Sequence, residues 1–189
     1  MIERLFKIKK YIPFGCYMTI FDIPFGKLYE EGKRKILIDV DNTMLPYDLK
    51  YPTDEIRKLF NDLKEMGYEI ILLSNNNYER VSLVGDELGV SYFAKAYKPL
   101  KCGFKKALRK LNCDKKEIIT IGDQLMTDIL GSNRVGLDGI LVKAIKRKTE
   151  KWYTKLNRKR EENVLRRIGK YNLKKYDEIM SVRGENIEN

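Results

Sequence analysis

The sequence predicts an α/β fold, a three-layer Rossmann-like core in which helices cover both faces of a central parallel sheet. From Lys35 to Val142, short apolar runs alternate with amphipathic helical segments. Strands that are apolar throughout are typical of a parallel sheet that is buried on both faces. The chain has 189 residues, 43% hydrophobic and 34% charged, which is typical of one soluble domain with a substantial core.

The predicted elements follow one another in a regular order. The first strand covers 36–38, and the next helix lies between Thr53, a residue type that caps helices, and Gly67, a residue type that ends them. An apolar strand at 70–73 precedes a helix at 78–88, which Gly89 closes. The remaining elements are an apolar piece at 90–94, a helix at 104–111, a strand at 118–121, a helix at 129–135 and a strand at 139–142.

We expect three regions along the chain. Residues 1–34 form an N-terminal segment that packs on the domain or contacts a membrane, residues 35–142 form the core, and residues 143–189 form a basic helical extension with a disordered end. The uncharged run at 11–21 follows a basic start, as in a signal peptide. Pro13 interrupts this run and no small-residue cleavage site follows, so we interpret it as part of the domain.

The excess positive charge lies in the extension. The formal net charge is +11, and residues 143–175 hold 14 Lys and Arg against three acids, whereas the rest of the chain has 24 of each sign. Charge of one sign in one place attracts anionic lipid head groups or nucleic acid. The segment also has an apolar side (Trp152, Tyr153, Leu156, Val164, Leu165 and Ile168) and a basic side that includes Arg158, Lys159, Arg166 and Arg167. We predict a helix that lies on an anionic membrane surface, and the alternative is an ordinary solvated helix.

Polar side chains follow three of the predicted strands. Asp39 and Asp41 follow the first, Ser74 follows the second and Asp123 follows the strand at 118–121. Ligands of parallel sheets bind beyond the carboxyl ends of the strands, so we expect these side chains to meet there. Two carboxylates so close together repel unless a cation or a shared proton offsets them. This arrangement favours Mg²⁺-assisted phosphoryl transfer, in which one carboxylate attacks phosphorus and the other handles protons.

Four motifs stand in order along the chain: Asp39-x-Asp41-x-Thr43, Ser74, Lys98-Pro99, and Gly122-Asp123 with Asp128. With these motifs the chain resembles the haloacid dehalogenase-like (HAD) superfamily. Further details resemble its YqeG branch, which is related to the phosphatidylglycerophosphate phosphatases of mitochondria. They are Ser74-Asn75-Asn76-Asn77, Gly122-Asp123-Gln124-Leu125-x-Thr127-Asp128, Gly131-x-Asn133-Arg134 and Asn157-Arg158-x-x-Glu161. The resemblance covers about residues 20 to 170.

The resemblance and the chemistry of the residues imply the same roles. Asp39 attacks phosphorus to form an aspartyl phosphate, and Asp41 protonates the leaving oxygen and then takes a proton from water. Ser74 and Lys98 hold the phosphate oxygens, and Thr43 and Asn75 complete the substrate-binding set. The Mg²⁺ ligands are Asp39, Asp41 through its backbone carbonyl, Asp123 and Asp128. Asp128 has an alternative role, as a cap of the helix that starts there, and helix packing explains Asn133 and Arg134 as well as catalysis does.

The spacing of the motifs leaves no room for a cap domain. Only 30 residues separate Thr43 from Ser74, and 22 separate Asn75 from Lys98. Each gap fits one helix and its connections, so we expect an open site in which the substrate's own body, or the surface on which it sits, helps to exclude water. Open sites suit large substrates.

The function that we favour is hydrolysis of a phosphomonoester in a membrane lipid, such as phosphatidylglycerophosphate, by a cytoplasmic protein at the inner face of the membrane. The alternatives are a phosphatase for nucleic acid ends or phosphoproteins, a receiver-like domain, and an RNA- or ribosome-binding protein with a vestigial HAD core. The presence of both Asp41 and Lys98 argues against a vestigial core. A receiver-like domain also carries a Lys, but it has no use for Asp41 as a leaving-group acid. The chain has no histidine, which excludes Ser-His-Asp and Cys-His sites and His-ligated zinc. Three cysteines, Cys16, Cys102 and Cys113, indicate reduced core thiols in a cytosolic protein.

Overall fold

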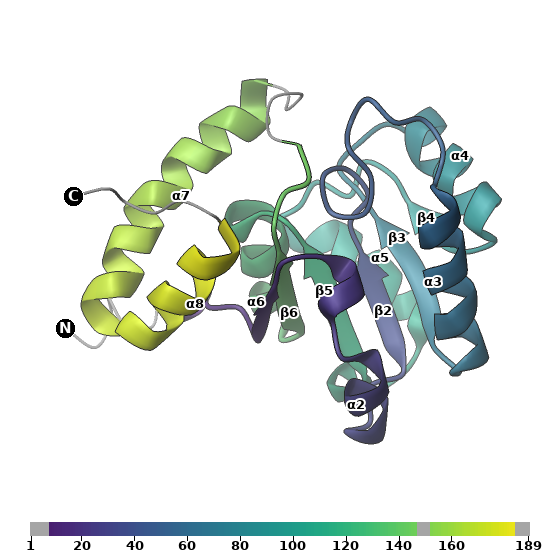
Figure 1. Ribbon diagram of the computed structural model, residues 1–189, viewed down its shortest axis with the longest axis horizontal. Coiled ribbons are helices and arrows are strands. Elements are labelled where there is room, and N and C mark those ends of the chain that lie inside the picture. The colour runs from purple at the N-terminus through teal and green to yellow at the C-terminus, as the bar shows by residue number, and fades with distance from the viewer. Residues whose placement is uncertain (1–7, 147–151, 184–189) are drawn as a thin grey trace.

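Six parallel strands form one sheet in the order β1-β6-β5-β2-β3-β4 (Figure 1). The computed structural model describes residues 8–146 and 152–183, and the side chains of Trp152, Tyr153 and Lys155 lie outside the described part. The strands are β1 (Gly15–Tyr17), β2 (Lys35–Ile38), β3 (Glu69–Leu73), β4 (Ser91–Phe93), β5 (Ile118–Gly122) and β6 (Asp138–Val142). The predicted α/β fold with a central parallel sheet is confirmed, and no cap domain interrupts the core between β2 and α5.

Helices cover both faces of the sheet, because successive residues of each strand point to opposite sides. Ile36 and Ile38 of β2 pack in a core with α2, α3 and α4, whereas Leu37 between them packs in a second core with α5 and the end of α6. The helices are α2 (Phe25–Glu30), α3 (Asp54–Glu65), α4 (Tyr78–Leu88), α5 (Lys101–Leu111), α6 (Leu130–Val135), α7 (Trp152–Tyr171) and α8 (Leu173–Arg183). Short 3₁₀ turns lie at Ile20–Asp22 and Lys115–Glu117, and a π-helical turn lies at Leu125–Ile129.

The caps that the sequence predicted are present. The Thr53 hydroxyl accepts a hydrogen bond of 3.3 Å from the backbone N–H of Ile56 at the start of α3. Gly89 ends α4 in the left-handed region with φ 59°, where glycine has no steric penalty. Several strands extend one residue beyond the predicted ranges. In addition, α5 begins three residues before the expected position, β4 is shorter than 90–94, and the π-helical turn precedes α6.

The N-terminal segment takes part in the sheet. Gly15–Tyr17 pairs with β6 as the edge strand β1, so the sheet extends beyond the expected core of residues 35–142. The side-chain amide of Asn133 in α6 donates to the backbone carbonyls of Lys10 and Ile12, each at 2.9 Å. Asn133 therefore anchors the segment that leads into β1, which is the packing role and not the catalytic one.

The C-terminal extension forms a helical hairpin that packs on the core (Figure 1). Leu165 and Ile168 of α7 are buried against Leu125 and Ile129 of the π-helical turn, together with Ile179 and Val182 of α8. We expected the apolar side of α7 to face a membrane, and for these two residues that is wrong, because the core and α8 already cover them. Leu156 is 43% exposed, and the side chains of Trp152 and Tyr153 lie outside the described residues.

Across residues 8–146 and 152–183, we find no helix with the length and apolar character that a membrane span requires.

Candidate active site

The carboxyl ends of β2, β3 and β5 bring the predicted polar residues to one edge of the sheet. β2 lies between β3 and β5, and Ile38 is in register with Leu72 on one side and Ile121 on the other. Asp39, which follows β2, and Asp123, which follows β5, therefore lie on adjacent strand ends. Ser74 follows β3 on the other side of β2. This is the arrangement that the sequence pattern predicted.

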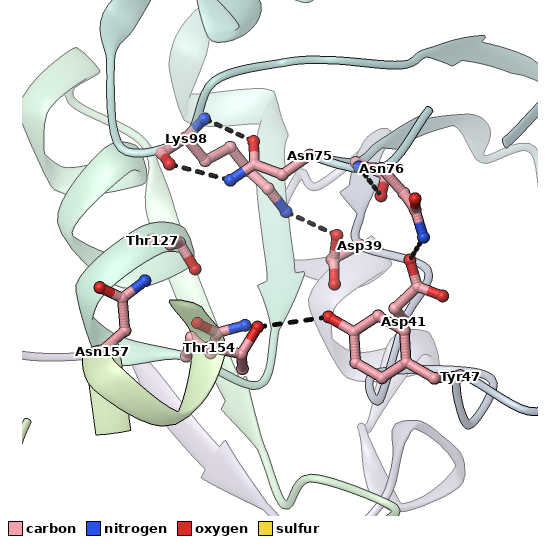
Figure 2. Close-up of a pocket in the computed structure, with 11 residues that line it drawn as sticks. Asp39, Asp41, Tyr47, Asn75, Asn76, Lys98, Thr127, Thr154 and Asn157 are labelled. Atoms are coloured by element: carbon pink, nitrogen blue, oxygen red, sulfur yellow. Dashed lines mark hydrogen bonds and ion pairs between the residues drawn. The ribbon is translucent and has the colours of Figure 1, made fainter. Parts of the chain in front are cut away.

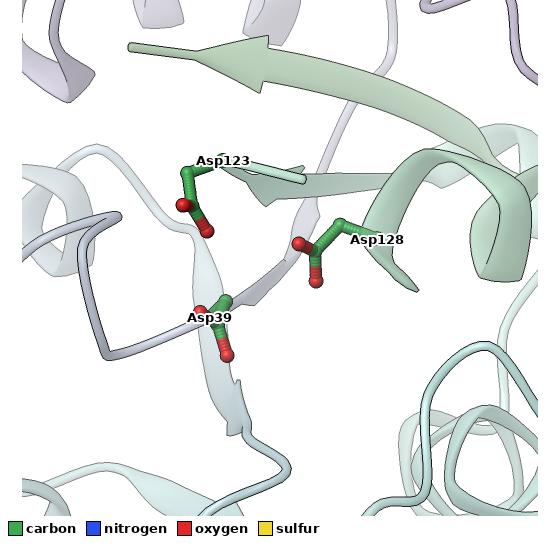
Figure 3. Close-up of side chains that lie close together, drawn as sticks. All are labelled: Asp39, Asp123 and Asp128. Carbon is green, nitrogen blue, oxygen red and sulfur yellow. The ribbon is translucent and has the colours of Figure 1, made fainter. Parts of the chain in front are cut away.

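Three carboxylates face one another at this edge (Figure 3). Asp39, Asp123 and Asp128 each offer an oxygen within 4.8 Å of the others, and all three residues are buried. Burial raises the pKa of Asp39 to about 8 although the ammonium of Lys98 lowers it, and the charges of Asp128 and Asp123 raise it further. Burial likewise raises the pKa of Asp123 to about 6, against the guanidinium of Arg158, which lowers it.

These carboxylates fit a divalent cation. Three buried acids in one place repel unless positive charge offsets them. Burial is the main cause of the raised pKa values of Asp39 and Asp123, and the charges of the neighbouring acids raise them further. Their donors are all oxygens, which suit a hard ion such as Mg²⁺. The side chain of Asp41 is outside this cluster.

Asp128 points into the site because its own turn holds it there. Its Oδ2 accepts hydrogen bonds of 3.1 Å from the backbone N–H of Gln124 and from the hydroxyl of Thr127. Its Oδ1 accepts from Nζ of Lys98 at 2.6 Å. The sequence left two roles open for Asp128, metal ligand or helix cap. Its carboxylate lies with the other acids instead of at the N-terminus of α6.

Lys98 lies between two of these acids. Its Nζ donates to Asp39 Oδ1 at 2.7 Å and to Asp128 Oδ1 at 2.6 Å. Burial lowers the pKa of Lys98, but the charges of Asp128 and Asp39 outweigh this effect and hold its pKa above the usual range. The backbone of Lys98 is fixed by Asn75, whose side-chain amide donates to the Lys98 carbonyl at 2.9 Å and accepts from its N–H at 2.6 Å (Figure 2).

Asp41 turns away from the three acids and toward α4. Its Oδ2 accepts from the side-chain amide of Asn76 at 2.8 Å, and its Oδ1 accepts from Nε of Arg80 at 3.2 Å. Arg80 also binds the backbone carbonyls of Pro46, Leu49 and Lys50. Arg80 thus fixes both Asp41 and the loop after it, and sequence reasoning missed this residue because it belongs to no motif.

The other two predicted residues lie close to these groups. The hydroxyl of Thr43 is 3.4 Å from Asp39 Oδ2 and 3.4 Å from Asp123 Oδ1. The hydroxyl of Ser74 accepts from the backbone N–H of Asn76 at 3.2 Å. Ser74 lines the same cavity as Asp39, Asp41 and Lys98, whereas Arg134 lies elsewhere and donates to the Pro99 carbonyl at 3.2 Å.

Helix α7 forms one wall of this cavity, a wall that we did not expect from the absence of a cap domain (Figure 2). Thr154 and Asn157 of α7 line it together with Tyr47, and the hydroxyls of Tyr47 and Thr154 are 3.5 Å apart. The cavity measures only about 40 Å³. Gln124 and Thr127, at the start of and within the π-helical turn that α7 contacts, add to the polar lining.

Arg158 of α7 contacts Asp123, one of the three acids. Its Nη1 donates to the backbone carbonyl of Asp123 at 2.7 Å, and its Nη2 pairs with Oδ2 of the same residue. The side chain is 11% exposed, so our expectation that Arg158 belongs to the basic, solvent-facing side of the helix is wrong. The Asn157-Arg158-x-x-Glu161 motif was the sequence signal for this wall, although the resemblance gave it no role in the site.

Comparisons with known proteins agree with one another. A sequence model of the haloacid dehalogenase-like hydrolases matches residues 4–136. The chain is 36% identical over 157 residues to the probable phosphatase YqeG of Bacillus subtilis, covering 83% of this chain and 91% of that protein. It is 27% identical to the glyceraldehyde 3-phosphate phosphatase of Pyrococcus abyssi, covering 69% of this chain and 56% of that protein.

Solved structures share the fold at low sequence identity. The cobalt-bound deoxy-D-mannose-octulosonate 8-phosphate phosphatase of Haemophilus influenzae matches with a TM-score of 0.52 and 16% identity, over 76% of this chain and 92% of that one. A putative 3-deoxy-D-manno-octulosonate 8-phosphate phosphatase from Vibrio cholerae matches with a TM-score of 0.51 and 18% identity, over 85% of this chain and 91% of that one.

Proposed function

The chain belongs to the haloacid dehalogenase-like hydrolases, and from this premise we propose that it is a Mg²⁺-dependent phosphatase that cleaves a phosphomonoester through an aspartyl phosphate. The observation that carries the proposal is the set of three buried carboxylates with Lys98 between two of them. A nucleophilic carboxylate, a cation site and a fixed ammonium are the parts that this reaction needs, and all lie at one end of the sheet.

Asp39, Asp123 and Asp128 would hold the metal ion, with the backbone carbonyl of Asp41 as a further ligand. When bound, Mg²⁺ supplies the positive charge that offsets these acids and polarises the phosphoryl group. Thr43 lies within 3.4 Å of both Asp39 and Asp123, and we assign it to orienting the two carboxylates and the phosphoryl group.

Asp39 and Asp41 carry out the two displacements. A carboxylate oxygen of Asp39 attacks phosphorus, the bond from phosphorus to the leaving oxygen breaks, and Asp41 gives that oxygen a proton. In the second step Asp41 takes a proton from water while the water oxygen attacks phosphorus, and the Asp39–phosphorus bond breaks to release phosphate. The contacts of Asp41 with Asn76 and Arg80 keep its side chain apart from the metal ligands.

Lys98 and Ser74 hold the phosphoryl oxygens as negative charge spreads over them. Asn75, which we expected to bind substrate, has both ends of its amide on the backbone of Lys98. We therefore assign Asn75 a positioning role, in which it fixes the loop that carries the ammonium group.

We propose a membrane lipid phosphate, such as phosphatidylglycerophosphate, as the substrate. An apolar groove of about 510 Å³ supports this choice, because one of its walls is the loop 43–46 that follows Asp41. The exposed side chains of Met18, Phe21, Leu49 and Ile145 line it, beside the cation of Lys143. Apolar side chains next to a cation suit the acyl region and the anionic head group of a lipid. This groove, instead of the buried side of α7, is then the membrane contact of a peripheral protein.

Phosphate release from p-nitrophenyl phosphate tests the activity. We expect release with Mg²⁺, none with EDTA, and none from Asp39→Asn, because an amide cannot attack phosphorus. Wild-type release from that variant would refute the mechanism.

A substrate panel tests the lipid proposal separately. Phosphatidylglycerophosphate in phosphatidylglycerol vesicles should be hydrolysed faster than sugar phosphates, phosphopeptides or 5′-phosphorylated RNA. A faster reaction on any soluble substrate would replace the lipid proposal while leaving the phosphatase assignment in place.

A further inference from the structure

The guanidinium of Arg158 binds both the backbone and the side chain of Asp123. Nη1 donates to the backbone carbonyl of Asp123 at 2.7 Å, and Nη2 pairs with the Oδ2 carboxylate oxygen. A planar guanidinium bound to the backbone and the side chain of one residue restricts the rotation of that side chain. The other oxygen, Oδ1, is on the side of Thr43, whose hydroxyl is 3.4 Å from it and 3.4 Å from Asp39.

A buried network in turn fixes Arg158. Glu161, one turn further along α7, is fully buried, and its Oε2 is 3.5 Å from Nη1 of Arg158 and 2.6 Å from Nη1 of Arg183. Its Oε1 accepts from the backbone N–H of Met126 at 3.3 Å. Met126 belongs to the π-helical turn that also carries Asp128. The hairpin of α7 and α8 is thus joined through charged groups to Asp123 and to the turn that carries Asp128.

We propose that Arg158 is a positioning residue for the metal site, which orients Asp123 so that docking of the C-terminal hairpin and binding of a divalent cation support each other. The inference rests on the proposed function, since it takes Asp123 as a metal ligand. Groups that hold a ligand from behind fix its geometry, and their loss typically weakens metal binding about 10- to 100-fold.

A competing effect has the opposite sign. The positive charge of Arg158 repels a cation nearby, and repulsion alone predicts tighter binding when the charge is removed. Glu161 and the Asp123 carboxylate both offset that charge, so we expect orientation to dominate. The direction of the change in affinity therefore decides between the two effects.

The test is the affinity of the full-length protein for Mn²⁺ alone, measured from the electron paramagnetic resonance signal of the free ion. Arg158→Gln should weaken binding about 10- to 100-fold. Arg166→Gln, the same charge change at an exposed position of the same helix, should change affinity less than about threefold, because exposed charges are screened. Affinity in Arg158→Gln equal to or tighter than in Arg166→Gln would overturn the inference.

A second variant separates geometry from charge. Arg158→Lys keeps the positive charge, but one ammonium cannot reproduce the planar fork, so it should also lose affinity by about tenfold. Wild-type affinity in Arg158→Lys would show that only the charge matters and would overturn the orienting role. This variant also serves if Arg158→Gln fails to fold by circular dichroism.

Coupling is reciprocal, so the metal must also act on the helix. Saturating Mg²⁺ should slow amide hydrogen exchange in residues 152–171 of the wild type and have little effect there in Arg158→Gln. Equal slowing in both proteins would contradict the coupling. These measurements need no substrate. If the wild type hydrolyses p-nitrophenyl phosphate but Arg158→Gln binds Mn²⁺ equally well, only this inference is refuted. If the wild type binds no Mn²⁺, the proposed function is refuted.

Discussion

Glu161→Gln should destabilise the protein far more than the same substitution at the next residue. Glu161 is fully buried and lies beside the guanidinium groups of Arg158 and Arg183. Glutamine keeps the shape of the side chain and one acceptor oxygen, but it removes the negative charge that both cations face. Glu162 is exposed, so Glu162→Gln is a matched control.

The size of the effect follows from this burial. Removing one partner of a buried ion pair costs about 3–5 kcal/mol, and a hydrogen bond to a charged group contributes about 1.5–3 kcal/mol. Because glutamine still accepts from the N–H of Met126 and Arg158 keeps its bond to Asp123, we expect a loss of about 2–3 kcal/mol. For a chain of this size that loss lowers the Tm by about 4–12 °C.

Thermal unfolding followed by circular dichroism measures this difference. Glu162→Gln should stay within about 0.5 kcal/mol of the wild type, as surface substitutions usually do. Chemical denaturation in urea gives the same comparison at one temperature and shows whether the slope is unchanged. If Glu161→Gln and Glu162→Gln unfold together, α7 does not dock through this network, and the wall that we describe for the cavity is wrong.

Three further predictions concern the site and the thiols. In Gly122→Ala the added Cβ would meet Cγ of Asp128 at 2.3 Å, so phosphate release should fall about 100-fold, whereas Gly26→Ala, with nothing within 4 Å, should retain wild-type activity. Asp41→Asn should slow the hydrolysis of alkyl phosphates by about 10²- to 10⁴-fold and that of p-nitrophenyl phosphate much less, because the p-nitrophenolate anion leaves without a proton. An equal loss of activity on both substrates would make Asp41 a structural residue. Cys102 is exposed, in contrast to our expectation of a core thiol, whereas burial raises the pKa of Cys16 from 9.0 to about 12. The native state therefore keeps the Cys16 proton after the unfolded chain has lost it, so stability should fall from about pH 9 to 12 by up to ~1.4 kcal/mol per pH unit, and urea denaturation of Cys16→Ala should show a smaller fall.

The sequence predicted the part of the site that local pattern determines. Asp39, Ser74 and Asp123 follow apolar strands, and a parallel sheet brings the carboxyl ends of such strands to one edge whatever the details of packing. Lys98 was predicted as a site residue from the Lys98-Pro99 motif. The direction of the Asp128 side chain depends on a π-helical turn, a rare element without a periodicity of its own, so the sequence left two roles open for it.

The sequence could not predict how α7 docks. The Asn157-Arg158-x-x-Glu161 motif singles out Arg158 among the many Lys and Arg of the helix, but it does not show what Arg158 contacts, because Asp123 lies 35 positions away in the sequence. The apolar residues Leu165 and Ile168 fit a membrane-facing side and a core-facing side equally well. The strand β1 was not predicted, because Gly15–Tyr17 has only three residues, too few to show the hydrophobic pattern of a strand.

The measurement that tests the central claim most directly is chemical trapping of the phosphorylated enzyme. Asp41→Asn, with its second step slowed, is incubated with Mg²⁺ and p-nitrophenyl phosphate, quenched and treated with borohydride, which reduces an acyl phosphate to the alcohol. Peptide mass spectrometry should then find homoserine in place of Asp39, and nowhere else. Phosphate release without reduction at Asp39, or with reduction at another carboxylate, would contradict the assignment of Asp39 as the nucleophile.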